Sequence, residues 1–376
     1  MTPPGRPNAR SGSSLVQISA ALLRAPAVPL SIESVEMADP RPDEIVVRIV
    51  SSGICHTDLS AMAGGPRTRY PMVLGHEGAG VVEAVGSAVS RLAAGDHVVL
   101  SFDYCGVCDR CRAGDPCYCR EFVLRNFGGV RPDGSSALAH NGQIVYGHYF
   151  GQSSFATHVI ARETNAIKVR KDVPLEMLGP LGCGIQTGAG AVLNTFDARP
   201  GSTIAVFGTG SVGLSAVMAA VVAGCTTIVG VDIMPSRLDA ARELGATHVF
   251  DGRTPGLADQ IAAITGHGLD FSFDTSGVAL EPALGCLDDL GVCGLVGGVR
   301  GGRLDLPFEL LRRGRSLRTI IEGDSVPGAF IPALIDLWMQ GRFPFDKMVR
   351  FYAFEEINQA ARDSETGMAI KPVLRF

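Results

Sequence analysis

The sequence lacks several features that would assign the protein to a special class. No block of basic residues interrupts a net charge of −5 over 376 residues, so nucleic acid is not expected as a partner. No apolar run approaches the roughly 18–20 residues that a membrane span needs, so we expect no membrane association. Internal repeats are also absent, which excludes a repeat architecture. The 46% hydrophobic and 19% charged residues instead fit a globular protein with a large core.

The N-terminus has little that predicts regular structure. Residues 1–14 are rich in Pro, Gly and Ser and predict a disordered tail. The apolar LVQISAALL that follows would also fit a short secretory signal, but Gln17 and Ser19 interrupt it and Arg24 ends it. We therefore expect a first strand there and a cytoplasmic protein. Disulfides seldom persist in that compartment, and clustered cysteines more often serve metal or redox chemistry.

The remaining chain is long enough for two domains, and its texture changes along its length. After about Gly182, buried strands alternate with helix-like runs, which predicts βαβ units and a parallel sheet. From about Glu322 the chain leaves this pattern and ends in KPVLRF, a short strand that could rejoin the first domain. Before Gly182, short runs between Gly, Pro and Asp predict a β-rich first half: EIVVRIV (44–50), VVEAV (81–85) and HVVLSF (97–102).

A glycine-rich turn marks a dinucleotide-binding site. GTGSVG (208–213) follows the buried strand TIAVF and opens a helix. Gly208 is expected to make the tight turn and Gly210 to admit the pyrophosphate, while Gly213 permits close helix–strand packing. Glycines that serve packing alone are the alternative interpretation.

The residues around this turn complete the dinucleotide fingerprint. Ser211 and Val212 begin the helix, whose free N–H groups would bind the phosphates. Asp232 closes the next strand and would accept the ribose hydroxyls. Because its carboxylate would repel a 2′-phosphate, NAD is expected rather than NADP.

Half of the ten cysteines lie within residues 105–119, CGVCDRCRAGDPCYC. Their spacing suits a closed tetrahedral zinc site, which would be structural because it leaves no open position. An iron–sulfur cluster also uses such spacing, but its usual fourth-cysteine signature is absent. A redox C-x-x-C is the remaining alternative.

A second set of metal-binding residue types is scattered along the chain. Cys55 and His56 lie in GICHTD, His76 and Glu77 in GHEGAG, and Cys183 in LGCGIQTG. Each alone is more often structural than a ligand, and a lone buried cysteine usually behaves as a small hydrophobe. The residues by themselves therefore leave this set undecided.

A family resemblance connects these motifs. GHEGAGVVEAVGSAV (75–89) resembles the signature of zinc-dependent medium-chain alcohol dehydrogenases. It stands between GICHTD and the cysteine cluster, with the dinucleotide fingerprint downstream, and the similarity covers about residues 17–376. Within the family, stretches such as YFGQSSFATHV and PLGCGIQTGAGAVLN look most like bacterial aryl-alcohol (benzyl alcohol) dehydrogenases.

The resemblance implies a catalytic zinc held by Cys55, His76 and Cys183, with one coordination position open. Such a zinc acts as a Lewis acid on an alcohol, whose hydride passes to NAD. Glu77 resembles a carboxylate that can also reach the metal, and Asp58 one that orients the ligand histidine.

The resemblance also implies a second, structural zinc, and it leaves Cys117 as the spare cysteine of the cluster. By the x2-x2-x7 spacing, the four ligands would be Cys105, Cys108, Cys111 and Cys119. We therefore expect two zinc ions per chain.

Thr57 matches the family's hydroxyl that takes the substrate proton and passes it through the nicotinamide ribose. Ser60 stands where many relatives end this relay with a histidine, so the relay must end in water or another group such as His56. In relatives, the position of His56 more often contacts the pyrophosphate, where Arg is common. Arg237 matches a basic residue near the adenosine ribose, and Lys371 a cation near the pyrophosphate.

The implied fold is α/β: a GroES-like β-rich catalytic domain and a Rossmann domain with a doubly wound parallel sheet. We expect a tail at 1–14, the catalytic domain at 15–184 with its zinc lobe at 103–120, the Rossmann domain at 185–321, and a return to the catalytic domain at 322–376.

The implied reaction is the reversible oxidation of a primary aromatic alcohol to the aldehyde, by a homodimer or homotetramer. A terpene or allylic alcohol dehydrogenase, or a glutathione-adduct (formaldehyde) dehydrogenase, is the alternative on the same scaffold. A non-catalytic NAD-binding protein is a remote alternative.

Overall fold

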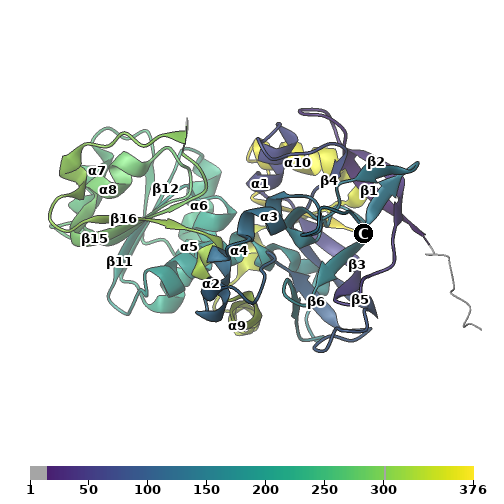
Figure 1. Ribbon diagram of the computed structural model, residues 1–376. Helices are drawn as coiled ribbons and strands as arrows, with labels where there is room; N and C mark the ends of the chain where they lie inside the picture. The colour runs from purple at the N-terminus through teal and green to yellow at the C-terminus, as the bar shows by residue number, and fades with distance from the viewer. Residues whose placement is uncertain (1–14, 300–301) are drawn as a thin grey trace, which may run out of the picture.

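The computed structural model describes residues 15–299 and 302–376, so the predicted disordered tail at 1–14 lies outside the described residues. The described chain forms two lobes that lie side by side (Figure 1). One lobe holds two β-sheets, and the other holds a single sheet with helices on both faces.

The β-rich lobe contains a five-stranded and a seven-stranded sheet, in which the pairs are antiparallel except for β17 with β18. In spatial order, the smaller sheet consists of β4 (Met72–Val73), β1 (Val16–Leu23), β2 (Ser31–Met37), β7 (Leu138–His140) and β8 (Gln143–Val145). The larger sheet consists of β10 (Ala166–Lys168), β6 (His97–Leu100), β5 (Glu77–Val85), β3 (Glu44–Gly53), β18 (Lys371–Arg375) and β17 (Val349–Ala353), with β9 (His158–Arg162) also paired to β3.

The other lobe is built on a six-stranded parallel sheet, as predicted. Its spatial order is β13 (His248–Asp251), β12 (Thr227–Asp232), β11 (Thr203–Phe207), β14 (Leu269–Asp274), β15 (Leu287–Val296) and β16 (Ser316–Ile320). The chain reverses direction across the sheet beside β11, which places a ligand crevice at the carboxyl end of that strand. The α/β fold class with a doubly wound sheet is therefore confirmed.

Helices cover the parallel sheet and connect it to the β-rich lobe (Figure 1). Those that belong to the βαβ units are α5 (Ser211–Ala223), α6 (Pro235–Glu243), α7 (Leu257–Ala262) and α8 (Leu280–Gly285). The others are α1 (His56–Met62), α2 (Asp109–Arg112), α3 (Phe122–Phe127), α4 (Gly184–Gly190), α9 (Pro327–Met339) and α10 (Ile357–Glu365).

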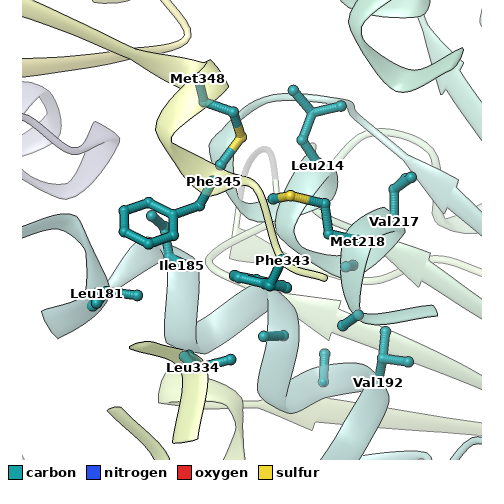
Figure 2. Packing of buried hydrophobic residues seen from close by; sticks show 14 of the residues in the cluster. Leu181, Ile185, Val192, Leu214, Val217, Met218, Leu334, Phe343, Phe345 and Met348 are labelled. Atoms are coloured by element: carbon teal, nitrogen blue, oxygen red, sulfur yellow. The ribbon is translucent and has the colours of Figure 1, made fainter. Parts of the chain in front are cut away.

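A hydrophobic core continues from one lobe into the other and fixes their relative position (Figure 2). Gly188 of α4 lies so close to α5 that an added Cβ would fall 1.9 Å from the carbonyl oxygen of Val212. No residue with a side chain could hold the two helices this close. The residues labelled in Figure 2 are Leu181, Ile185, Val192, Leu214, Val217, Met218, Leu334, Phe343, Phe345 and Met348.

Candidate active site and metal centres

Four predicted residues from distant parts of the chain meet between the lobes. Cys55 lies at the N-terminus of α1, His76 and Glu77 at the start of β5, and Cys183 at the N-terminus of α4. One ligand atom from each lies within 4.8 Å of those of the other three. Hydrogen bonding from the Cys183 thiol lowers the pKa of Cys55 well below its ordinary value, although burial opposes the shift. A thiolate suits a metal ligand.

His76 is oriented by Asp58, the residue predicted for this task. Its Nδ1 lies 3.0 Å from Asp58 Oδ1, and both side chains are fully buried. Asp58 is itself fixed by the backbone N–H groups of Cys55 and Gly75, each at 3.1 Å. Phe150 stacks on the His76 ring with centroids 4.5 Å apart.

The other imidazole nitrogen of His76 decides whether the cluster fits a metal. Within the described part of the chain, His76 Nε2 is buried without a hydrogen-bond partner. A buried polar atom without a partner is costly, and here it faces two cysteines and a carboxylate. A Cys₂His donor set of this kind suits zinc with one open position. The residues therefore fit the metal that the resemblance implies.

Glu77 and Lys371 form a buried ion pair beside this cluster. Lys371 Nζ lies 2.9 and 2.8 Å from the two carboxylate oxygens of Glu77 and donates a further bond to the Ile54 carbonyl. Burial raises the pKa of Glu77, although the charge of Lys371 opposes it. An added Cβ on Gly184 would fall 3.5 Å from Lys371 Nζ and 3.6 Å from Ser211 Oγ, so Lys371 lies near the glycine-rich turn, and its place beside a pyrophosphate stays a prediction.

The cysteine cluster forms a second candidate metal centre in a lobe of its own. The sulfur atoms of Cys105, Cys108, Cys111 and Cys119 lie within 4.8 Å of one another. Cys108 and Cys111 sulfurs are 3.5 Å apart, and Cys105 and Cys111 sulfurs 3.9 Å. A tetrahedral site with zinc–sulfur bonds of ~2.3 Å would separate its sulfur atoms by roughly 3.8 Å. This geometry fits a closed zinc site.

Cys117 lies outside this group of four. Its side chain is 1% exposed, and burial raises its pKa to about 12. Its sulfur instead contacts the carbonyl oxygen of Ser325 at 3.7 Å. Its position therefore separates Cys117 from the four candidate ligands.

A cavity of about 440 Å³ lies over the carboxyl ends of the parallel strands. Gly208 takes a φ of +89°, as the tight turn requires, and a Cβ on Gly213 would fall 1.8 Å from the Gly208 carbonyl oxygen. At Gly210 a Cβ would point into open space, 4.0 Å from Arg237. The predicted residues in the cavity wall are His56, Gly208, Gly210, Ser211, Val212, Asp232 and Arg237, together with the ligand Cys55.

Asp232 and Arg237 lie together in this wall. Asp232 Oδ2 accepts hydrogen bonds from the backbone N–H of Thr209 at 2.8 Å and from its hydroxyl at 3.1 Å. Arg237 lies 3.9 Å from the same oxygen, and its Nε has no hydrogen-bond partner among the described residues. The glycine-rich turn is thus tied to the carboxylate that would meet a ribose.

A second cavity of about 150 Å³ adjoins Thr57. Its walls include Ser60, Phe127 and Tyr149, and the guanidinium of Arg67 lies 5.9 Å from the Phe127 ring centroid. His56 and Ser60 both lie in α1, yet they line different cavities. His56 lines the cofactor cavity and Ser60 lines this one. Thr57 Oγ1 lies 3.8 Å from the sulfur of Cys55.

Sequence reasoning missed one ionisable group at the centre of the site. Glu322 is 8% exposed, and its Oε1 lies 3.7 Å from the sulfur of Cys183. Burial raises its pKa to about 7. Its Oε2 accepts a hydrogen bond from Gln186 at 3.2 Å. No sequence motif marks Glu322 itself. Its partner Gln186 lies three residues after the predicted ligand Cys183, which is the one sequence signal near this contact.

Comparison with known proteins identifies the family. The sequence model of the alcohol dehydrogenase GroES-like domain matches residues 41–171, and that of the zinc-binding dehydrogenase matches residues 211–338. Geraniol dehydrogenase from Castellaniella defragrans is 45% identical over 368 residues, which cover 96% of this chain and 98% of the relative. The chain belongs to the zinc-dependent medium-chain alcohol dehydrogenases. The predicted family is confirmed, and zinc and a nicotinamide dinucleotide are the cofactors of the enzyme.

Two solved structures resemble the enzyme over nearly the whole chain. Benzyl alcohol dehydrogenase from Acinetobacter calcoaceticus is 43% identical, with a TM-score of 0.93, over 96% of this chain and 100% of that one. An alcohol dehydrogenase zinc-binding domain protein from Burkholderia ambifaria is 50% identical, with a TM-score of 0.94 and the same coverage. Among the described residues, no helix is both long and apolar enough to span a membrane.

Proposed function

We propose that the enzyme oxidises a primary alcohol whose hydroxymethyl group is attached to an aromatic ring, and that the aldehyde is the product. The cavity beside Thr57 carries this proposal. Phe127 and the buried Tyr149 offer ring surfaces to a flat apolar substrate, and such surfaces favour aromatic partners. The cavity adjoins Thr57, which follows the predicted ligand Cys55 by two residues, so an alcohol bound there would present its hydroxyl to the metal centre.

A primary allylic terpene alcohol is the second candidate. Geraniol dehydrogenase resembles this chain at 45% identity, about as closely as benzyl alcohol dehydrogenase at 43%. Both named substrates carry a hydroxymethyl group on an unsaturated carbon, so one apolar cavity suits either. The two proposals differ in the length of the alcohol that the cavity must admit, because a terpene alcohol is longer than a benzyl alcohol.

The proposed catalytic zinc ligands are Cys55, His76 and Cys183. When bound there, zinc supplies Lewis acidity that lowers the pKa of the substrate hydroxyl. Asp58 holds His76 in the tautomer that leaves Nε2 free for the metal. Lys371 offsets the charge of Glu77 beside the two cysteines. The proposed structural ligands are Cys105, Cys108, Cys111 and Cys119.

Thr57 is the proposed first acceptor of the substrate proton. Its hydroxyl faces the metal centre from the start of α1 and lies in the wall of the substrate cavity. Ser60 lines the same cavity, whereas His56 reaches the cofactor cavity on the other side. A relay through the nicotinamide ribose would therefore meet His56 or water rather than Ser60.

NAD is the proposed dinucleotide, and it accepts the hydride. Asp232 places its buried carboxylate in the wall of the cofactor cavity, where a 2′-phosphate would meet its negative charge. Ser211 begins α5 there, and the free N–H groups of that first turn suit the pyrophosphate. Arg237 lines the same cavity, where its positive charge suits the ribose or phosphate.

A homodimer or homotetramer is the proposed assembly. Strand β16 lies at one end of the parallel sheet, and no described strand pairs with its outer edge. An open edge of this kind can pair with a second chain. Size-exclusion chromatography with light scattering would measure the assembly, and a monomer would contradict the proposal.

A substrate panel tests the proposed function. NADH absorbance would be followed with benzyl, cinnamyl, geranyl, perillyl and short aliphatic alcohols. The largest kcat/KM is expected for an aromatic alcohol, and the largest value for geranyl alcohol would favour the terpene assignment. A largest value for ethanol would contradict both.

A further inference from the structure

A turn with unusual backbone geometry borders the catalytic site. Glu322, Gly323 and Asp324 form it, with φ values of 51°, 68° and 49°. Three consecutive residues with positive φ are rare when two of them carry side chains, and surrounding contacts must hold them there. The turn follows β16 of the parallel sheet and precedes Ser325, which is fully buried.

On one side, the cysteine lobe holds this turn. The hydroxyl of Tyr118 donates a hydrogen bond of 2.7 Å to Asp324 Oδ1. The sulfur of its neighbour Cys117 lies 3.7 Å from the carbonyl oxygen of Ser325. Both lobe residues directly precede Cys119, the last proposed ligand of the structural zinc. The fold of the lobe therefore sets where Tyr118 and Cys117 meet the turn.

On its other side, the turn reaches the catalytic cluster. Glu322 spans the first turn of α4, because one carboxylate oxygen meets Cys183 at 3.7 Å and the other meets Gln186 at 3.2 Å. Ser325 donates a hydrogen bond of 3.1 Å to the amide oxygen of Gln186. Gln186 and Ser325 are fully buried, so little water competes for these bonds.

We propose that the turn Glu322–Ser325 links the two metal centres: the cysteine lobe holds the turn through Tyr118 and Cys117, and the turn holds Glu322 against Cys183. Glu322 is then a positioning residue for a ligand of the catalytic zinc. This inference rests on the proposed assignment of the zinc ligands. It also gives Cys117, the spare cysteine of the cluster, a place in the link rather than in the metal site.

The size of the effect follows from the other contacts of Asp324. Thr195 donates a hydrogen bond of 2.9 Å to its second carboxylate oxygen, and Arg318 one of 2.6 Å. Loss of the Tyr118 hydroxyl therefore loosens the turn without releasing it. Substitutions along such networks typically change coupling by a factor of roughly 2 to 30.

Tyr118→Phe tests the link while keeping the aromatic packing of the lobe. The measurement is the rate of zinc release from the holoenzyme to a chromophoric chelator, in parallel with residual activity. The zinc lost in step with activity is the catalytic one. We expect its release to be roughly three- to tenfold faster, with release of the lobe zinc changed less than twofold. Unchanged catalytic release, or equal acceleration of both phases, would overturn the link.

Tyr352→Phe is the matched control. Its hydroxyl also donates a 2.7 Å bond to a carboxylate, Asp363, but neither residue contacts a candidate metal ligand among the described residues. We expect both zinc release rates to stay within twofold of the wild type. Acceleration equal to that of Tyr118→Phe would show general loosening and overturn the link.

A double-substitution cycle tests the route through Glu322. Glu322→Gln alone is expected to speed release of the catalytic zinc roughly tenfold, as for other groups that support a ligand. In that background, Tyr118→Phe should add less than twofold. If the two effects multiply, Tyr118 does not act through Glu322 and the link is overturned.

The zinc content of the wild type separates this inference from the assignment on which it rests. Two zinc ions per chain, with release rates unaffected by Tyr118→Phe, would overturn the link alone. One zinc ion per chain would overturn both the ligand assignment and the link. Which alcohol the enzyme prefers does not enter either result.

Discussion

The two candidate metal centres of this enzyme are built in opposite ways. The cysteine lobe takes its proposed ligands from fifteen consecutive residues, and three of the four cysteines are only half-buried. The catalytic cluster takes Cys55, His76 and Cys183 from three distant elements and surrounds them with buried side chains. A local site needs only its own loop, whereas the distributed site needs the whole fold to be correct.

The partners of the sulfur atoms differ in the same way. In the lobe, the backbone N–H groups of Arg120 and Cys111 lower the pKa of Cys108 to about 6. In the catalytic cluster, side chains from other elements set the state of Cys55, first among them the Cys183 thiol. Backbone N–H groups survive most substitutions, so the catalytic site is the more sensitive to single changes.

Cys183→Ser should have the largest effect on the reaction. We expect kcat/KM to fall by about three orders of magnitude, because Lewis acidity supplies several kcal/mol of transition-state stabilisation. Zinc content should fall from two ions to one while the lobe keeps its metal. Steady-state NADH kinetics and metal analysis check this outcome, and retention of a tenth of the activity would contradict the ligand assignment.

Cys119→Ser should act on stability instead. Structural zinc contributes folding free energy directly, so we expect the melting temperature to fall by roughly 10 °C and one zinc ion to be lost. Calorimetry and metal analysis measure both. Cys117→Ser is the matched control, two residues away in the same lobe, and should keep both zinc ions. Loss of a zinc ion in Cys117→Ser but not in Cys119→Ser would make Cys117 the ligand and Cys119 the spare cysteine.

Asp58→Asn should weaken the catalytic centre without emptying it. The substitution removes the charge that orients His76, and groups of this kind typically contribute 10- to 100-fold to metal affinity. Competition with a chelator should show that loss for the catalytic zinc alone. Equal weakening of the lobe zinc would contradict a specific role of Asp58 at the catalytic centre.

His56→Arg should have the smallest effect, confined to the cofactor. A guanidinium can bind phosphate in a bidentate manner, whereas a neutral imidazole cannot. We expect NADH to bind roughly three- to tenfold more tightly, with zinc content and melting temperature unchanged. Fluorescence titration of NADH gives the affinity, and an unchanged Kd would remove His56 from the phosphate site.

Local spacing in the sequence predicts the candidate sites whose residues are close neighbours along the chain. The turn Gly208–Gly213 and the cysteines of the lobe form sites with neighbours in the sequence, so their geometry follows from the spacing of a few residues. The scattered proposed ligands Cys55, His76 and Cys183 could be grouped only through the family resemblance. Each depends on a tertiary contact that no local pattern encodes.

The parts that were not predicted depend on contacts between distant segments. Glu322 meets Cys183 across 139 positions, and Tyr118 meets Asp324 across 206. The sequence also gives no indication of the contact between Lys371 and Glu77, which the pairing of β18 with β3 brings about. The ion-pair partner of a charged residue in a short strand depends on which strands pair, and the local sequence does not show this pairing.

The position of β18 constrains the order in which the two lobes can fold. This strand lies between β3 and β17 in the seven-stranded sheet, yet it follows the whole six-stranded sheet in the chain. During synthesis on the ribosome, every strand of the parallel sheet is therefore made before β18 can complete the seven-stranded sheet. Until then β3 lacks its pairing with β18, and Glu77 lacks its ion pair with Lys371. The ion pair between Lys371 and Glu77, beside the catalytic cluster, therefore forms only after the parallel sheet has been synthesised.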